Sequence, residues 1–179
     1  RMYEMFLGPV EISKPWDTKG IEGVHRFLKK LWRLFYDDVK GKVWNEEKAN
    51  DAELKVLHKT IKKIEEDTER FSFNTGVSTF MIAVNELSDL KCHKKEILEP
   101  LVIMLTPYAP HIAAELYAEL SKVSPPAGGG DLGGTPSFPK FEPKYVTESP
   151  KDYPVAINGK TRTELTLDLN ITQQEVEQI

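Results

Sequence analysis

The sequence predicts a mainly α protein: an antiparallel bundle of four to five helices, followed by a linker and a small, truncated β-hairpin segment. Apolar residues recur at spacings of three and four between residues 21 and 122, which is typical of helices that bury one face. Residues 124–136 then contain five Gly and three Pro, a composition that interrupts regular structure. Beyond them, short strand-like runs flank an Asn-Gly pair, which favours a hairpin.

These changes of pattern divide the chain into four parts: a connecting segment (1–20), a helical domain (21–122), a Gly/Pro-rich linker (123–150) and the truncated start of an α/β domain (151–179). Within the helical domain we expect no β-strand, and helices at about 21–38, 50–69, 73–89, 94–106 and 111–122. The second helix has Asn50 or Asp51 available as its N-cap. Pro100 should kink the fourth helix or delay its start.

Composition limits the class of protein. The 179 residues are 40% hydrophobic and 29% charged, which is typical of a soluble globular domain. Cys92 is the only cysteine, so no intrachain disulfide can form. No apolar run approaches the ~20 residues that span a bilayer, so we expect a cytoplasmic protein that has no membrane partner.

Charge is unevenly distributed along the chain. The net charge is −4, which argues weakly against a partner that is a nucleic acid. Residues 25–63, however, carry eleven Lys and Arg against six Asp and Glu, whereas residues 64–123 carry five against ten. This asymmetry permits a polyanion-binding surface on the basic part.

The first predicted helix carries two opposite stripes. Its apolar stripe consists of Val24, Phe27, Leu28, Leu31, Leu34 and Phe35. Four cations repeat with the same spacing on the other side, at about 100° per residue: Arg26, Lys29, Lys30 and Arg33. No acidic residue occurs between Val24 and Tyr36, so neutralising partners within the helix are missing. The basic stripe indicates either a surface that contacts RNA phosphates or an ordinary solvated helix face.

The C-terminal residues offer a second basic pair. Lys160 and Arg162 are two residues apart on a predicted strand, which places them on one face of it. They are either exposed strand cations or a further contact with RNA. The preceding turn, Asn158-Gly159, should be of type I′, and residues 172–175 read as a helix capping box.

Other candidate sites are weaker. A phosphate-binding loop at residues 128–134 is disfavoured against a linker, because no Gly-Lys-Ser/Thr follows. The four histidines lack the paired spacing of a zinc site, so we expect no metal. The three tryptophans are more typical of packing residues than of platforms for RNA bases: Trp16, Trp32 and Trp44.

Several segments resemble bacterial-type leucyl-tRNA synthetases, which belong to class I. The most specific are residues 13–17 (SKPWD) and 23–33 (GVHRFLKKLWR), which are similar to the entry of that family's anticodon-binding domain, and residues 155–162 (VAINGKTR). Further segments follow in the family's order, at residues 2–9, 73–75 and 105–113. The Pro-His-Ile at 110–112 is shared with valyl and isoleucyl relatives.

The resemblance implies the fold of a class I anticodon-binding domain, joined through residues 1–20 to a catalytic domain of the same polypeptide. It implies a monomeric parent enzyme that joins leucine to tRNA using ATP with magnesium, with leucine tRNA as partner. It also implies that this chain supplies tRNA binding, through Arg26, Lys29, Lys30, Arg33, Lys160 and Arg162.

The catalytic motifs of class I synthetases, His-Ile-Gly-His and Lys-Met-Ser-Lys-Ser, do not occur in the sequence. We therefore expect no catalytic residue, no cofactor bound by this chain, and no activity of the chain alone. The alternative functions are a helical protein-interaction or scaffold module, or the equivalent domain of a valyl or isoleucyl relative.

Overall fold

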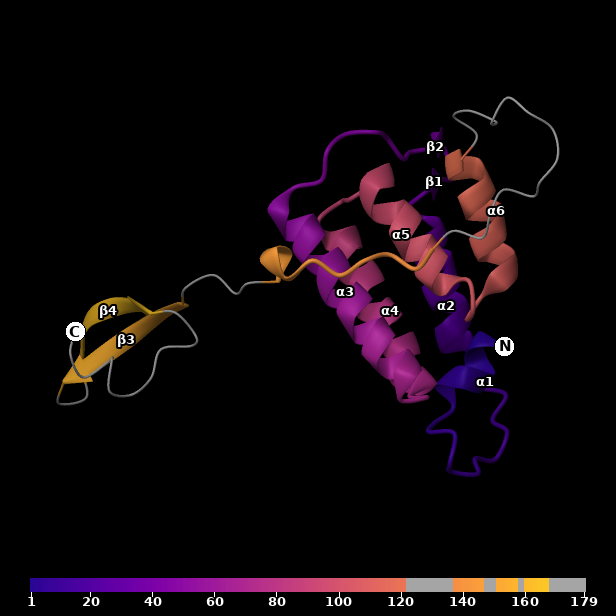
Figure 1. Ribbon diagram of the computed structural model, residues 1–179, viewed down its shortest axis with the longest axis horizontal. Coiled ribbons are helices and arrows are strands. Elements are labelled where there is room, and N and C mark those ends of the chain that lie inside the picture. Colours follow the sequence, from indigo (N-terminus) through magenta and orange to yellow (C-terminus); the bar gives the residue numbers. More distant parts are fainter. Residues whose placement is uncertain (122–136, 147–150, 158–159, 168–179) are drawn as a thin grey trace. The chain divides into compact units, whose positions relative to one another are not determined.

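The computed structural model describes residues 1–121, 137–146, 151–157 and 160–167. The chain forms two compact units, Arg1–Tyr145 and Val146–Ile179. In the described part of the first unit, a short helix α1 (Met2–Phe6) precedes five longer ones: α2 (Ile21–Trp32), α3 (Asp51–Glu69), α4 (Phe73–Asp89), α5 (Lys95–Leu105) and α6 (Pro110–Ser121) (Figure 1). The predicted mainly helical fold is confirmed.

The core of the first unit lies between these helices. α3 packs against α4, and α5 packs against both α6 and α3. The side chains of Phe80, Leu101 and Leu116 are at most 1% exposed, and burying each such side chain stabilises a protein by about 1.5–3 kcal/mol. The helical periodicity in the sequence therefore reports a shared hydrophobic core.

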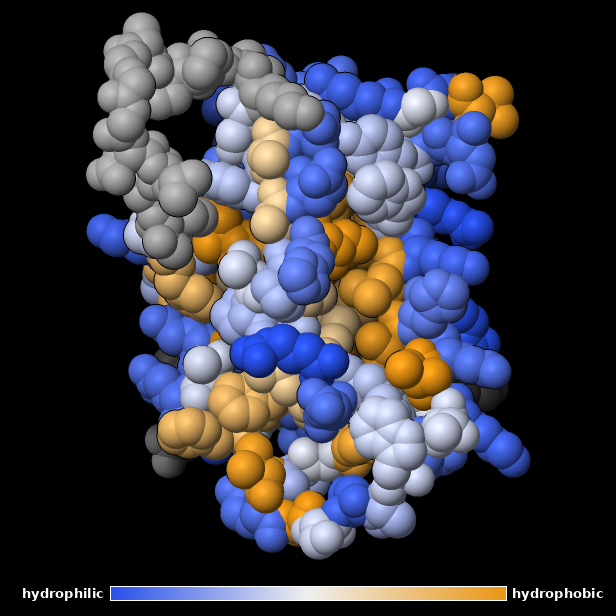
Figure 2. Space-filling view, turned by 90° about the vertical axis from the view of Figure 1, so that its right-hand side faces the viewer, coloured by the Kyte–Doolittle hydropathy of each residue, from blue (hydrophilic) through white to orange (hydrophobic). Residues whose placement is uncertain are grey.

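The N-terminal segment contributes less to this core. Val10, Ile12 and Trp16 are each more than half exposed. Figure 2 views the unit from the right-hand side of Figure 1. It shows apolar side chains over the centre of this face and mostly hydrophilic ones along its right flank. Part of the apolar surface of the unit is thus left uncovered by its own helices.

The first predicted helix ends earlier than expected, and two short strands follow it. α2 ends at Trp32, and β1 (Tyr36–Asp37) pairs with β2 (Gly41–Lys42) in an antiparallel hairpin. The prediction of no strand in this region is wrong. The Asp37 carboxylate accepts hydrogen bonds from the backbone N–H groups of residues 39 and 40, both at 2.9 Å, and Gly41 has a φ of +71° that suits a three-residue loop.

A capping box fixes the start of α3. The Asn50 side chain accepts from the backbone N–H of Glu53 at 2.9 Å, and the Glu53 carboxylate accepts from that of Asn50 at 2.8 Å. Glu53 Oε2 also accepts from Lys94 Nζ at 2.9 Å. The predicted cap is confirmed as Asn50, and its partner Glu53 ties α3 to the residue before α5.

Pro100 lies inside α5, which begins at Lys95. The helix starts two residues before the apolar run that begins at Ile97, so the alternative of a delayed start is wrong. α6 begins at Pro110 and contains His111 near its N-terminus, as the sequence predicts.

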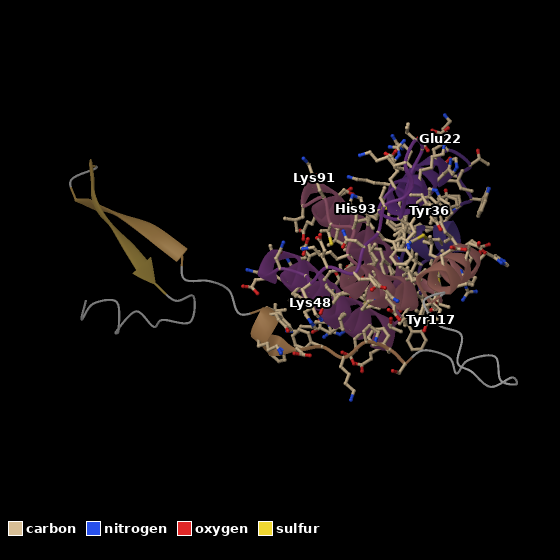
Figure 3. The ribbon with its side chains drawn as sticks, turned by 90° about the horizontal axis from the view of Figure 1, so that it is seen from above. Glu22, Tyr36, Lys48, Lys91, His93 and Tyr117 are labelled. Atoms are coloured by element: carbon tan, nitrogen blue, oxygen red, sulfur yellow. The ribbon has the colours of Figure 1, made fainter. Side chains whose placement is uncertain are left out.

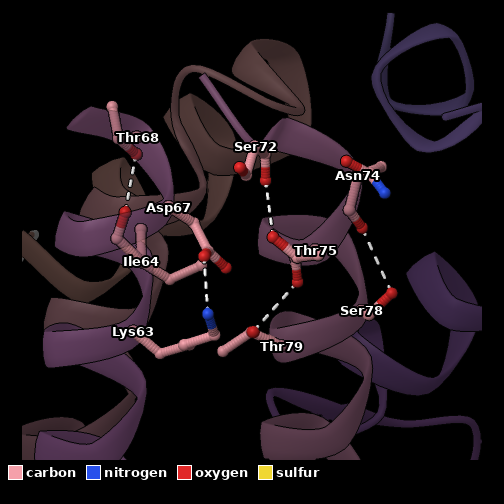
Figure 4. A network of polar contacts seen from close by, with 9 residues as sticks. All are labelled: Lys63, Ile64, Asp67, Thr68, Ser72, Asn74, Thr75, Ser78 and Thr79. Carbon is pink, nitrogen blue, oxygen red and sulfur yellow. Dashed lines mark hydrogen bonds and ion pairs between the residues drawn. The ribbon is translucent and has the colours of Figure 1, made fainter. Parts of the chain in front are cut away.

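The connections after α3 and after α4 share one geometry. Phe71 has a φ of 56° and Lys91 a φ of 53°. After α3, the N–H groups of Phe71 and Ser72 donate to the carbonyls of Thr68 and Asp67, and the equivalent bonds after α4 join residues 91 and 92 to 88 and 87. This is the Schellman ending, whose left-handed position is usually glycine. Polar bonds around the first of these corners, including Lys63 to Asp67, are shown in Figure 4.

The left-handed conformation at Phe71 gives a stability prediction. Replacing Phe71 by Gly should raise the free energy of unfolding by about 1 kcal/mol over Phe71→Ala, since a Cβ in this conformation costs about 1–2 kcal/mol. Both variants lose the edge contact with Phe73, whose ring centroid is 5.8 Å away, so their difference isolates the backbone effect. Urea unfolding measures it, and equal stability of the two variants would show that Phe71 is not strained.

Residues 137–145, which we call the strap, pack against α3. The backbone N–H of Glu142 donates to Nδ1 of the buried His58 at 3.2 Å, and the His58 ring stacks on Tyr145 with centroids 4.6 Å apart. Burial lowers the pKa of His58, which favours the neutral ring whose Nδ1 can accept this bond. The strap ends in the 3₁₀ turn Pro143–Tyr145.

The described part of the second unit is one antiparallel hairpin, β3 (Lys151–Ile157) paired with β4 (Lys160–Leu167). Ile157 pairs with Lys160, in agreement with the predicted hairpin around a two-residue connection. Three predictions lie outside the described residues: the turn type at 158–159, the capping box at 172–175, and the linker or loop at 124–136.

Candidate nucleic-acid interface

The two stripes of α2 lie as the sequence predicts. Val24, Phe27 and Leu31 are at most 6% exposed and join the core. Arg26, Lys29 and Arg33 are exposed, and Lys30 is partly exposed. The amphipathic pattern of one helix therefore places the four cations outward as a group.

A groove of about 470 Å³ runs along this basic face. All four predicted cations line one side of it, and Leu34 follows them on the chain. Ser88, Lys91 and His93, from the end of α4 and the connection to α5, complete the lining. In Figure 3, Lys91 lies at the edge of the unit and His93 lies inward of it. We call this site the basic groove.

The basic groove carries an excess of positive charge. Among the residues that the structure describes, its lining contains five Lys or Arg and no Asp or Glu. Among the described residues, none of these five cations forms an ion pair with a carboxylate. The lining thus concentrates uncompensated charge, although the whole chain is net negative.

One of the cations also has a structural contact. Lys30 Nζ donates to the side-chain oxygen of Asn85 on α4 at 2.7 Å, so it joins α2 to α4. Lys29, Arg26 and Arg33 have no such side-chain bond within the described structure. Lys30 is consequently the least suitable of the four for testing charge alone.

The far side of the basic groove is held firmly. The His93 ring donates from Nδ1 to the carbonyl oxygen of Leu34 at 2.8 Å. The His93 carbonyl accepts from the backbone N–H of Asn45 at 2.9 Å, and the Asn45 carbonyl accepts from Lys95 at 2.8 Å. These bonds fix the α4–α5 connection against the end of α2 before any ligand binds.

Sequence reasoning did not identify this far side. Ser88, Lys91 and His93 lie about 60 residues beyond the stripe, and no periodicity links them to it. A local signal existed for Lys91 alone, because it lies two residues beyond the end of the helix predicted at 73–89. It could not show which way the connection folds.

Lys160 and Arg162 belong to the second unit. The strand register shifts between Val155 and Ala156, which pair with Thr163 and Thr161, so Arg162 is an extra residue on β4. Such a bulge interrupts regular alternation. The expectation that Lys160 and Arg162 share one face rested on that alternation, and the spacing alone no longer supports it.

A second hollow provides a useful contrast. It lies over α3 and α4, and Lys55 and Lys59 line it together with Glu86 and Asp89. In this hollow two cations are balanced by two acidic residues, so positive charge does not accumulate. The excess in the basic groove is therefore not a general property of lysines on this unit.

Tryptophans differ in their surroundings. Trp44 is buried, as expected for a packing residue. Trp16 is 60% exposed but touches Tyr3 edge-on, so it packs against another ring without being buried. Trp32 is 38% exposed and stacks on Tyr36 at 4.6 Å between ring centroids.

The described residues contain no group of three or more His, Cys, Asp or Glu that could hold a metal ion. Within the same residues, no helix combines the length and the apolar character needed to cross a bilayer.

Comparisons with known proteins agree with a helical domain of this kind. Residues 52–178 match the family model described as the anticodon-binding domain of tRNA ligase. The chain is 55% identical to the leucine–tRNA ligase of Christiangramia forsetii over 99% of its own length, and 54% identical to that of Flavobacterium psychrophilum over 100%. The leucine–tRNA ligase of Bacteroides thetaiotaomicron is 48% identical over 99%.

The chain spans 18% of the length of each of these three relatives. Among solved structures, the Agrobacterium radiobacter K84 agnB2 LeuRS, in a ternary complex with tRNA and LeuAMS, matches with a TM-score of 0.66 and 24% identity. That match covers 99% of this chain and 24% of the other, and it supports the fold. The chain therefore belongs to the anticodon-binding domain family of tRNA ligases, and it corresponds to that region of leucine–tRNA ligases.

Proposed function

We propose that this chain holds the phosphate backbone of leucine tRNA, so that a parent leucine–tRNA ligase can join leucine to that tRNA using ATP. The observation that carries the proposal is the basic groove, whose described lining contains five Lys and Arg residues and no acidic residue. Lys and Arg bind phosphate oxygens by charge and by hydrogen bonds.

The chemistry of the basic groove favours a grip on the backbone over the reading of bases. Its lining offers cationic donors, one hydroxyl and one imidazole. Contacts from such groups to phosphate and ribose position an RNA by charge and shape without specifying its sequence. We therefore expect the basic groove to contribute affinity and orientation, while identification of leucine tRNA depends on other contacts.

The remaining roles belong to other parts of the parent enzyme. We assign ATP with magnesium, and the joining of leucine to tRNA, to the catalytic domain of the same polypeptide, to which residues 1–20 would lead. Lys160 and Arg162 are candidates for a further contact with tRNA from the second unit. We expect the parent enzyme to act as a cytoplasmic monomer.

Binding that depends on salt tests the proposal. A labelled leucine tRNA, titrated with the 179-residue chain, should bind more weakly as salt rises from about 50 to 200 mM, because neutralised phosphates release counterions. Four contacts predict a slope of log affinity against log salt near −3. A non-cognate tRNA should show a similar slope. Absence of binding at low salt, or binding that ignores salt, would favour a protein-interaction module instead.

A further inference from the structure

Lys91 has a left-handed backbone conformation, which is unfavourable for a residue with a side chain. It sits at the left-handed residue of the ending after α4, where the N–H of Lys91 donates to Ser88 O at 3.0 Å and that of Cys92 to Leu87 O at 2.9 Å. A residue with a Cβ is disfavoured there, whereas glycine is not. The sequence keeps a lysine where the backbone alone would favour glycine.

Among the described residues, one other non-glycine position has a left-handed conformation, and its surroundings are different. Phe71 has its ring 5.8 Å from that of Phe73, in an edge-on contact that uses the side chain within the protein. Lys91 is exposed, forms no ion pair with the described acidic residues, and lines the basic groove. Its side chain therefore has no hydrogen bond or ion pair with the described residues that would compensate for the backbone conformation.

Unfavourable backbone conformations that packing does not explain are concentrated at functional sites. At Lys91 the conformation turns the chain sharply at the end of α4, across the basic groove from α2. The neighbouring His93 is anchored to Leu34, so this connection is already in place. A cation on such a fixed support can meet a phosphate without first ordering the chain.

We propose that Lys91 contacts a phosphate of the bound tRNA, so that the RNA backbone lies between two basic sides, α2 and the α4–α5 connection. This inference rests on the proposed binding of tRNA in the basic groove. It adds a residue from outside the basic stripe and accounts for the lysine at a position that suits glycine.

Three variants of Lys91 test the inference. Lys91→Gln keeps the Cβ and loses the charge, so affinity for leucine tRNA should fall about fivefold at 0.15 M salt, the share of one phosphate contact. Lys91→Gly should bind as weakly as Lys91→Gln and yet melt at a higher temperature, because glycine relieves the backbone. Lys91→Arg should bind like the wild type. Phe71→Gly, the matched control at the same kind of helix ending, should bind tRNA like the wild type.

Two outcomes would overturn the inference. Wild-type affinity in Lys91→Gln, with binding weakened in Lys29→Ala/Arg33→Ala, would remove Lys91 from the interface and leave the proposed function intact. Wild-type affinity in both variants would reject the basic groove as the tRNA site, and the inference with it. A more stable Lys91→Gly that binds less tRNA would support both the contact and its backbone cost.

Discussion

Replacing both Lys29 and Arg33 by Ala is expected to weaken the affinity for leucine tRNA about twentyfold at 0.15 M salt, since each phosphate contact contributes a factor of about five at that concentration. The slope of log affinity against log salt should also become shallower by about 1.5. Both side chains point away from the core, so the free energy of unfolding should change by no more than ~0.5 kcal/mol for each. Fluorescence anisotropy at several salt concentrations measures affinity and slope together.

The matched control is Lys55→Ala/Lys59→Ala. It removes two cations with the same four-residue spacing on a helix, but from the hollow that also contains Glu86 and Asp89. The two double variants have the same net charge, so general attraction to RNA falls equally in both. An equal loss of affinity would therefore show that overall charge, and not the basic groove, holds the tRNA.

Of the substitutions proposed for this protein, Glu53→Ala should lower the free energy of unfolding the most. The Glu53 carboxylate is 3% exposed and accepts from both Lys94 and the backbone of Asn50. Glu53→Ala leaves the Lys94 ammonium, 17% exposed, without its partner, and removing one member of a buried pair costs about 3–5 kcal/mol. Because Lys94 retains some solvent contact, we expect a loss near the lower limit. Urea unfolding monitored by circular dichroism measures it.

Glu53→Gln separates the two roles of this residue. A glutamine oxygen can still accept from the Asn50 N–H, so the cap is kept and only the charge pair is lost, with an expected cost of about 1–2 kcal/mol. Glu65→Ala, at an exposed position on the same helix, should change stability by at most ~0.5 kcal/mol. If Glu53→Ala were no worse than Glu65→Ala, the Glu53–Lys94 pair would contribute nothing.

The same pair predicts a dependence on pH. Burial raises the pKa of Glu53, but the hydrogen bonds from Lys94 and from the Asn50 backbone lower it more, so the pKa lies below its ordinary value of 4.5. A lowered pKa stabilises the fold above the ordinary value, and this stabilisation is lost as the pH falls through the folded pKa. The stability difference between wild type and Glu53→Gln should therefore shrink below about pH 4.5.

The sequence could predict what depends on neighbouring residues. Helix positions, the Asn50 cap and the outward stripe of α2 follow from spacing and from local hydrogen-bonding groups. The end of α2 was misplaced because Leu34 and Phe35 are buried at 2% and 1% even though they lie beyond the helix. Their apolar spacing continues the helical pattern, while Asp37 and Gly41 form the turn.

The side of the basic groove formed by the α4–α5 connection could not be predicted, for a different reason. Lys91 and His93 reach α2 through tertiary contacts, such as the bond from His93 to Leu34, that no sequence period encodes. Likewise, the grouping of Lys160 with Arg162 assumes regular alternation, and the pairing of β4 with β3 contains a register shift at this point. In both places the pairing between segments, and not the propensity of a single segment, decides the structure.

The anchoring of the strap to His58 has a consequence for how the chain tolerates changes in length. Fifteen residues, 122–136, separate the end of α6 from the strap, and the strap is attached to α3 by the Glu142–His58 bond and the Tyr145 stack. The entropy of closing a loop grows only with the logarithm of its length, by about 0.6 kcal/mol per doubling. Insertions or deletions between α6 and the strap should therefore leave the attachment of the strap to α3 unchanged. The chain would continue towards its C-terminal residues from the same point on α3.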